Sequence, residues 1–153
     1  MIALLQRVTR ASVSVRGDEV AAIHRGLLVF LGVERGDGES QADRLLERLL
    51  AYRVFPGAEG RMTLDLNAVQ GGLLLVPQFT LAADTRKGNR PSFTSAASPD
   101  EGARLFAYIG ERAAALHRPT AFGVFGADMQ VELVNDGPVT FWLSVPPGPV
   151  PAH

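Results

Sequence analysis

The sequence predicts an α+β fold, in which a single domain combines a mostly antiparallel sheet with two main helices. The first observation is the length, since 153 residues match one domain of ordinary size. The second is the composition, because 46% hydrophobic and 20% charged residues are typical of a globular chain and exclude a disordered or fibrous one. The third is the order of the elements: about six or seven strand-like segments do not alternate regularly with the helical ones, which disfavours a doubly wound fold.

The predicted strands are short apolar or alternating segments between turns. Residues 2–15 alternate, most clearly at 11–15, as a half-buried strand does, and a turn leads into a second strand at 19–23. The apolar run at 27–33 is flanked by glycines and predicts a buried central strand. The remaining predicted strands lie at 62–64, 73–76, 121–134 and 139–145, the last two joined by a turn at 135–138.

The first helix is predicted to begin near Ser40, with Asp43 three residues later as a weak capping box. Its apolar residues recur at the i, i+3, i+4, i+7 spacing that places side chains on one buried face. They are Ala42, Leu45, Leu46, Leu49 and Leu50.

A stronger signal opens the second helix, because Ser98 suits an N-cap, Pro99 suits the first helical position and Glu101 would close a capping box. The helix is predicted to reach about Arg118, where Pro119 ends it. Its inward-facing residues are predicted to be Phe106, Ile109, Ala113 and Leu116. The domain then spans 1–145, and the proline-rich residues 146–153 are expected to form a mobile tail.

Charge and residue usage exclude several classes of function. A net charge of −1 lacks the global basic footprint of proteins that coat nucleic acid, and the absence of cysteine removes thiolate chemistry and fits a reducing cytoplasm. No signal peptide or membrane-spanning run is present, so we expect a cytoplasmic protein without membrane contact. The three histidines lack ligand-like spacing, and the common nucleotide-binding, zinc-protease and serine-hydrolase motifs are missing, so we expect neither a metal nor a cofactor.

The segment that follows the strand at 73–76 is the first candidate site. Pro77 cannot donate to a strand ladder, so pairing is expected to be broken or at an edge there. Backbone N–H groups of Gln78, Phe79 or Thr80 would then be free to face a ligand, and Thr80 adds a hydroxyl that can position water or attack. The alternative is that Gln78 and Thr80 are ordinary polar positions at a strand end.

The segment Asn135–Thr140 is the second candidate. Its simplest interpretation is a hairpin turn, in which Asp136-Gly137 supplies a positive φ and Pro138 sets the next residue. A cis Gly137-Pro138 bond would point to function, but the sequence does not determine the isomer.

Three of the 15 basic residues lie within five positions, at Arg86, Lys87 and Arg90. A solvated loop is the default interpretation of residues 85–90. The sharper alternative is a loop that contacts phosphate beside the Gln78–Thr80 segment.

Together these residues resemble the D-aminoacyl-tRNA deacylase family. The resemblance covers residues 1–145 in order. It is carried by Gln6-Arg7-Val8-Thr9-Arg10-Ala11-Ser12-Val13, by Gln78-Phe79-Thr80-Leu81-Ala82-Ala83-Asp84-Thr85, by Arg90-Pro91-Ser92-Phe93, by Ala127-Asp128-Met129-Gln130-Val131, and by Asn135-Asp136-Gly137-Pro138-Val139-Thr140-Phe141-Trp142-Leu143.

The resemblance implies the family's fold, with the sheet curled into a partial barrel, and a homodimer whose two active sites lie at the subunit interface. The implied reaction hydrolyses the ester between a D-amino acid and the terminal adenosine of tRNA. Glycine mischarged on tRNA-Ala is a further candidate substrate. Gly137-Pro138 would be a cis pair inserted from the partner subunit, where its backbone excludes an L side chain.

The resemblance also implies roles for individual residues. The N–H groups of Phe79 and Thr80 would hold the developing oxyanion, with Gln78 against the same ester. Arg7 would brace the Gly-Pro segment. Phe125 and Met129 would line the adenine pocket, although without the resemblance their interpretation is core. Thr80 is expected to position rather than attack, because no histidine or lysine neighbours it in sequence, and the substrate's ribose 2′-hydroxyl is the other candidate for activating the attack.

One departure from the family pattern is Pro77, where the family usually has serine. A related branch with Pro-Gln at this position has a looser chiral filter and acts on mischarged L-alanyl-tRNA. The segment 135–140 resembles the D-specific branch instead, so D-specificity is expected. The alternatives are this relaxed branch and a non-catalytic binder of the tRNA 3′ end.

Overall fold

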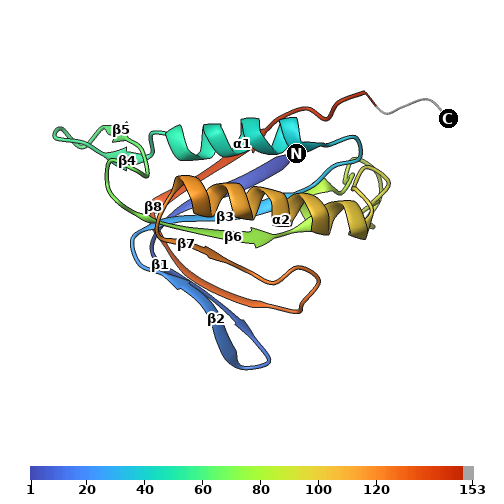
Figure 1. Ribbon diagram of the computed structural model, residues 1–153, viewed down its shortest axis with the longest axis horizontal. Coiled ribbons are helices and arrows are strands. Elements are labelled where there is room, and N and C mark those ends of the chain that lie inside the picture. Colours follow the sequence, from blue (N-terminus) through green and yellow to red (C-terminus); the bar gives the residue numbers. More distant parts are fainter. Residues whose placement is uncertain (150–153) are drawn as a thin grey trace.

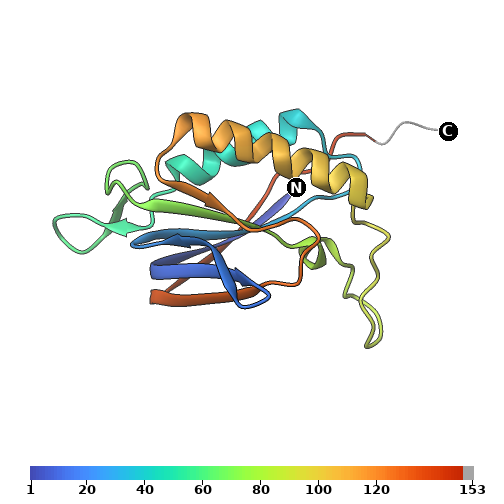
Figure 2. The ribbon, with the colours of Figure 1, turned by 60° about the horizontal axis from the view of Figure 1, so that its bottom comes forward.

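A six-stranded mixed sheet forms the centre of the molecule, and two α-helices pack on one of its faces (Figures 1 and 2). The computed structural model describes residues 1–149. The strand order is β2–β1–β3–β6–β7, and β8 pairs with β1. The elements are β1 (Ile2–Val15), β2 (Asp18–Ile23), β3 (Gly26–Gly32), α1 (Glu39–Ala51), β6 (Gly72–Pro77), the 3-10 helix η1 (Phe79–Ala82), α2 (Pro99–Leu116), β7 (Thr120–Phe122) and β8 (Gln130–Ser144), with a separate ribbon of β4 (Phe55–Pro56) and β5 (Met62–Leu64). The predicted α+β class with two helices is confirmed.

Strand β1 organises the sheet because it pairs along both of its edges. Its first half pairs with β3 and its second half with β2, while β8 runs antiparallel along the other edge. The β3–β6 and β6–β7 pairings are parallel. They are joined through α1 and α2, since parallel neighbours need a crossover connection. The sheet is therefore antiparallel around β1 and parallel where the helices cross over.

Helix α1 begins earlier than the sequence predicts. The N-cap is Gly38 rather than Ser40, and its N–H donates to the side-chain oxygen of Gln41 at 2.9 Å. Asp43 is not part of the cap; its carboxylate accepts from the Tyr108 hydroxyl at 3.0 Å and so joins α1 to α2. The prediction was wrong because a glycine N-cap has no side-chain oxygen to reveal it.

Helix α2 begins as predicted, with the Glu101 N–H donating to Ser98 Oγ at 3.3 Å and Pro99 in the first turn. The capping box stays half formed, because the Glu101 carboxylate binds Arg104 at 3.1 Å instead. The helix ends at Leu116, whose side chain is 61% exposed. The prediction that Leu116 points inward was wrong, since the last turn extends beyond the core.

The region after α2 differs from the two predicted strands. Strand β7 is only Thr120–Phe122, and β8 is one strand through the segment expected to be a hairpin turn. Both halves of β8 pair with β1, and the register shifts on either side of Val8. Residues 135–138 are therefore an irregularity within one strand, where extra residues bulge out of the ladder. Local turn residues suggested a reversal that the long partner strand prevents.

The apolar side chains form two layers, one on each face of the sheet. The helix-covered face holds the larger cluster, which includes Leu5, Leu27, Leu45, Leu73 and Leu105. The opposite face holds a smaller one of Val8, Ala11, Val13, Ala21, Ile23, Leu28, Leu74 and Val76, with Met129 and Val131 packed against it. The segment before β8 and β8 itself therefore contribute side chains to this second layer.

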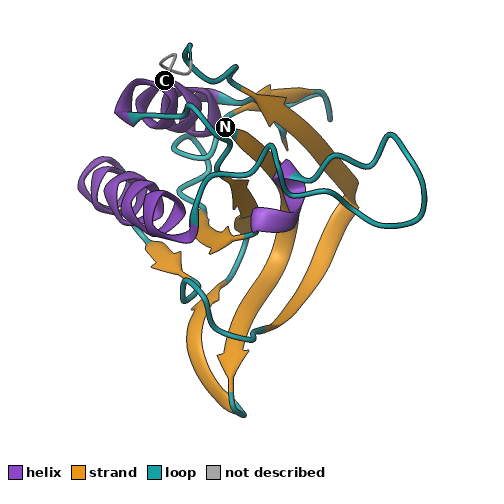
Figure 3. Ribbon diagram, turned by 90° about the vertical axis from the view of Figure 1, so that its right-hand side faces the viewer, coloured by secondary structure: helices purple, strands orange, loops and turns teal. Residues whose placement is uncertain are grey.

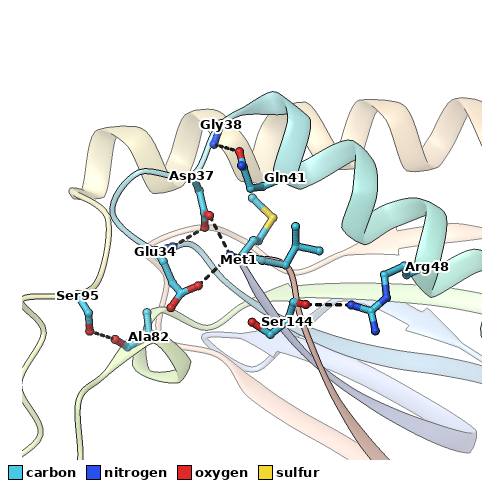
Figure 4. A network of polar contacts seen from close by, with 10 residues as sticks. Met1, Glu34, Asp37, Gly38, Gln41, Arg48, Ala82, Ser95 and Ser144 are labelled. Carbon is cyan, nitrogen blue, oxygen red and sulfur yellow. Dashed lines mark hydrogen bonds and ion pairs between the residues drawn. The ribbon is translucent and has the colours of Figure 1, made fainter. Parts of the chain in front are cut away.

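The amino terminus lies in a cluster of polar contacts that ties the chain ends to the β3–α1 loop (Figure 4). The Met1 amine donates to Glu34 at 2.9 Å, to Asp37 at 2.8 Å and to the Val145 carbonyl at 2.7 Å. Burial raises the pKa of the Asp37 carboxyl, and the adjacent amine opposes that shift.

Beyond β8, the predicted tail has at least one contact with the domain. The Gly148 N–H donates to the Gly36 carbonyl at 3.1 Å. The rest of that prediction concerns residues 150–153, which lie outside the described residues. In the described part of the chain, no helix is long and apolar enough to cross a membrane.

Candidate active site

A cavity of about 470 Å³ opens at the C-terminal end of β6, where the first candidate segment lies. Four of the predicted site residues line it: Gln78 directly after β6, Phe79 at the start of η1, and Phe125 and Met129 from the β7–β8 connection. Its other lining residues are Phe30, Val76, Pro77, Pro99, Gly126, Ala127 and Val131. The walls are therefore mostly apolar with a few polar groups at one edge, as in most small-molecule sites.

Pro77 ends β6 without breaking its pairing with β3. It pairs with Leu31, and the next N–H, that of Gln78, donates to the Leu31 carbonyl at 2.7 Å. Successive N–H groups of a strand point to opposite neighbours, so the position of the missing N–H faces the β7 side. Pairing with β7 has already ended at Leu75–Phe122. The expected loss of pairing thus holds on the β7 side and is wrong on the β3 side.

The chain turns directly after Gln78 into η1, the short purple helix at the end of the sheet in Figure 3. The Gln78 N–H is not free, as it serves the ladder with β3. The N–H groups of Phe79 and Thr80 are the first two of η1, and neither has a hydrogen-bond acceptor among residues 1–149. Two adjacent backbone donors therefore stand unpaired at the edge of the cavity.

Thr80 does not line the cavity but is held by a residue that does. The Gln78 side-chain amide donates to Thr80 Oγ1 at 2.5 Å. Within the described residues this is the only hydrogen bond of the Thr80 hydroxyl, and an amide is not a base. No group there could remove the hydroxyl proton to make Thr80 a nucleophile.

Two further contacts hold η1 in place. Ser95 Oγ donates to the Ala82 carbonyl at 2.5 Å, and the Phe79 ring packs against Phe93 with centroids 5.1 Å apart. Phe79 nevertheless remains 60% exposed.

Phe125 and Met129 belong to the cavity wall, so their alternative interpretation as plain core residues is incomplete. Met129 Sδ accepts from the Val124 N–H at 3.3 Å and packs against the apolar layer. The Phe125 ring lies 6.3 Å from that of Phe106 on α2. Both therefore touch the core on one side and the cavity on the other.

Gly137-Pro138 is a cis pair, exposed on the outer edge of β8. Arg7 braces the residue before it, with Nε donating to the Asp136 carbonyl at 3.0 Å and Nη1 donating to the Val54 carbonyl at 2.7 Å. On the other side, the Val139 N–H donates to Asn135 Oδ1 at 2.8 Å. The segment is thus held from two sides while its backbone faces outward.

Within one chain, this cis pair is remote from η1. Asn135 and Thr140 flank Arg7 in the register of β1, whereas η1 packs on Gly32, which pairs with Ile2. Ile2 and Arg7 are five positions apart on β1, which corresponds to about 17 Å at about 3.4 Å per residue. The two candidate segments therefore form one site only if a second chain supplies one of them.

Sequence reasoning missed Phe30, Pro99 and Val131 as cavity residues, and Asn135 as a support of the cis pair. Phe30 and Val131 look like ordinary strand residues, and Pro99 looks like a helix start. Only Asn135 had a signal, since asparagine commonly bonds nearby backbone in irregular segments.

Other parts of the molecule carry less chemistry. A larger cavity of about 680 Å³ lies between the C-terminal halves of α1 and α2, but it contains none of the predicted site residues. The buried His117 bonds the Gly71 carbonyl through Nε2 at 2.7 Å, which is a structural contact. Among residues 1–149, no group of three His, Cys, Asp or Glu side chains is placed to hold a metal ion.

Two unpaired backbone N–H groups at the edge of an apolar cavity can stabilise an oxyanion. The fold and this site therefore indicate an enzyme that acts on an acyl group, such as an ester. The family model for D-Tyr-tRNA(Tyr) deacylase matches residues 4–144. The chain belongs to this family, whose members hydrolyse the aminoacyl ester bond. The resemblance noted in the sequence is thereby confirmed.

Individual relatives agree with this assignment. A D-aminoacyl-tRNA deacylase of Thioalkalivibrio sulfidiphilus is 62% identical over 147 residues, which are 96% of this chain and 99% of that protein. A solved structure described as c-Myc DNA Unwinding Element Binding Protein superposes with a TM-score of 0.91 at 38% identity, covering 95% of this chain and 99% of the other. A solved structure described as a probable eukaryotic D-amino acid tRNA deacylase, at 16% identity and a TM-score of 0.80, shares the fold over 94% of this chain and 98% of its own.

Proposed function

We propose that this hydrolase removes D-amino acids from tRNA by cleaving the ester to the terminal adenosine, and that its complete site requires two copies of the chain. The observation that carries the proposal is the pair of unpaired N–H groups at Phe79 and Thr80, on the edge of an apolar cavity. The products are free D-amino acid and tRNA. A cytoplasmic location follows from this substrate, because aminoacyl-tRNA is made and used there.

The two N–H groups act on the ester carbonyl. Water adds to the carbonyl carbon and gives up a proton. The carbonyl oxygen then gains negative charge and accepts hydrogen bonds from the N–H groups of Phe79 and Thr80. Collapse of the adduct breaks the bond between that carbon and the ribose oxygen, which leaves with a proton. Removing one such donor from other hydrolases lowers kcat by about 10²- to 10³-fold, so the two N–H groups together can account for a large part of the stabilisation of the transition state.

Thr80 acts as a positioning group. Its hydroxyl oxygen accepts from the Gln78 amide, which leaves its own proton free to donate to the substrate or to a water. No described residue beside it can serve as a base, so the proton acceptor comes from the substrate or the solvent. The ribose 2′-hydroxyl next to the ester is the nearest such group.

The D-selectivity is assigned to Gly137-Pro138 of the partner subunit. Several features of β8 support docking of a second copy: its outer edge has no partner strand among residues 1–149, Trp142 on it is 54% exposed, and the cis pair is exposed. A rigid backbone wall against the α-carbon rejects an L side chain by steric conflict while leaving a D side chain its space.

The adenine is assigned to the part of the cavity lined by Phe125 and Met129. An aromatic ring and a polarisable thioether suit the flat face of a base. This placement leaves the ester at the polar edge of the same cavity, beside Gln78 and η1.

The deciding experiment compares cleavage of D-tyrosyl-tRNA, L-tyrosyl-tRNA, L-alanyl-tRNA and glycyl-tRNA-Ala, each with and without EDTA. We expect rapid loss of the D-ester, retention of both L-esters and no effect of EDTA; cleavage of the glycyl ester would widen the substrate range. Cleavage of L-alanyl-tRNA would support the relaxed branch that Pro77 suggests. Binding of tRNA without cleavage of any ester would contradict the proposal and favour a non-catalytic binder.

The two-copy site has its own control. An inactive Gly137→Val chain mixed with a chain altered in η1 should regain part of its activity, because one mixed site then combines an intact η1 with an intact cis pair. No recovery in a confirmed mixed dimer would contradict a site shared between subunits.

A further inference from the structure

The loop between Asp84 and Ser92 concentrates cations, with three of them within the five positions 86–90. It holds three cations, Arg86, Lys87 and Arg90, and one carboxylate, Asp84, whereas the whole protein has a net charge of −1. All residues from 85 to 91 are exposed, and no apolar side chain between 85 and 90 attaches the loop to the core. Figure 2 shows the segment, in yellow-green, projecting away from the sheet.

The base of this loop is rigid. Asp84 and Ser92 exchange two backbone hydrogen bonds, at 2.7 and 3.0 Å. The Asp84 carboxylate also accepts from the Arg86 backbone N–H at 3.0 Å and from the Arg86 guanidinium at 2.9 and 2.6 Å. The only carboxylate of the loop is thereby used to fix its shape and to neutralise Arg86.

Lys87 and Arg90 remain without a counter-charge. Among residues 1–149, neither has a carboxylate within 4.0 Å, and both side chains are exposed. Seven residues separate Asp84 from Ser92, so the tip lies at most about 12 Å beyond the base at about 3.3 Å per residue. Two unpaired cations are therefore presented on a braced arm, Lys87 near its tip and Arg90 two residues before its base at Ser92.

The arm begins two residues after η1, the element that holds the candidate oxyanion donors. If the terminal adenosine occupies the cavity, the preceding nucleotides must leave it past this end of the sheet. The arm therefore begins beside the exit of the cavity, where the nucleotides that precede the adenosine would pass.

We propose that Lys87 and Arg90 contact the phosphodiester backbone of the RNA strand that precedes the terminal adenosine, and so position the acceptor end in the cavity. This inference rests on the proposed function. The contact is electrostatic and independent of base sequence, as phosphate contacts are, so it adds affinity for tRNA without selecting the amino acid.

The test uses two charge-matched double variants, Lys87→Ala/Arg90→Ala and Arg53→Ala/Arg61→Ala. Arg53 and Arg61 are also exposed cations without an ion pair among the described residues, but they flank and connect the β4–β5 ribbon at the opposite end of the molecule (Figure 1). Binding of uncharged tRNA is measured between 50 and 200 mM salt. Cleavage is measured on D-tyrosyl-tRNA and on D-tyrosyl-adenosine, which has no phosphate.

We expect the loop variant to bind tRNA about 3- to 30-fold more weakly and to lose about 1.4 from the log–log salt slope, as for two single-strand phosphate contacts. It should raise KM for D-tyrosyl-tRNA without changing kcat, and it should cleave D-tyrosyl-adenosine at the wild-type rate. The control variant should behave as wild type in every assay.

Equal salt slopes in the loop variant, the control and the wild type would overturn the inference. So would a loop variant whose defect is a changed oligomeric state, because its cations would then serve the subunit interface. Failure of the wild type to cleave either ester would contradict the proposed function instead, and the binding measurement would still decide whether the loop contacts RNA.

Discussion

Replacing Arg7 by lysine should loosen the cis Gly137-Pro138 segment while keeping a positive charge in place. Arg7 is 11% exposed, and two different nitrogens of its planar guanidinium reach the carbonyls of Asp136 and Val54 at 3.0 and 2.7 Å. A lysine ammonium is a single point, so it can keep only one of these contacts in the same geometry.

The loss of one hydrogen bond to a charged group costs about 1.5–3 kcal/mol. If that energy holds the cis pair against the substrate, the ratio of D- to L-tyrosyl-tRNA cleavage rates should fall by roughly 10- to 150-fold. The midpoint of thermal unfolding should fall as well, by roughly 3–12 °C for a chain of this size.

Arg10→Lys is the matched control, because Arg10 also lies on β1 and also reaches β8, but through an exposed ion pair with Glu132 at 3.2 Å. Exposed pairs contribute little, so neither selectivity nor unfolding should change measurably. The reasoning would be refuted if Arg7→Lys kept the wild-type D-to-L ratio. A drop in unfolding temperature with an unchanged ratio would show that Arg7 supports the fold without positioning the cis pair.

Three other changes test the site and its surroundings. A side chain at Gly32 would place Cβ 2.9 Å from Leu81 Cβ on η1, so Gly32→Ala should cost about 1–3 kcal/mol in urea unfolding and lower kcat/KM roughly tenfold by displacing the helix. Pro77→Ser should change unfolding by less than about 1 kcal/mol and retain cleavage, because the proline replaces no ladder hydrogen bond; complete loss of activity would contradict this geometry. The Arg86 guanidinium holds the pKa of Asp84 at about 2, so the contact stabilises the loop above the ordinary carboxyl pKa of 3.8 and is lost as the pH falls through about 2. Titration by NMR should reproduce that value, and Arg86→Ala should return it toward 3.8.

Features that depend on residues a few positions apart could be predicted before the fold was known. The start of α2 follows from Ser98 and Pro99, and the buried strands follow from apolar runs such as 27–33 and 73–76. Capping and hydrophobic periodicity act within one or two turns, so they can be recognised without knowing the fold. The Gln78–Thr80 candidate was found for the same reason, since Pro77 is a local signal.

The contacts between segments that are far apart in the sequence could be seen only in the folded structure. Residues 135–138 have the composition of a turn, yet both halves of β8 continue along β1, more than 100 residues away in sequence. Local turn propensity is outweighed there by a ladder that pairs both halves with one strand. The same long-range pairing determines that Arg7 reaches Asp136, and that the cis pair lies far along β1 from the level of its own η1.

The cavity shows most clearly which features of the site follow from local sequence and which depend on the fold. Which N–H of residues 78–80 is free depends on the register of β6 against Leu31, and this register uses the Gln78 N–H and leaves those of Phe79 and Thr80. The local sequence thus identifies the candidate site residues, because the side chains and their neighbours in sequence are known without the fold. The backbone donors that they present depend on pairing across the sheet, which only the folded chain establishes.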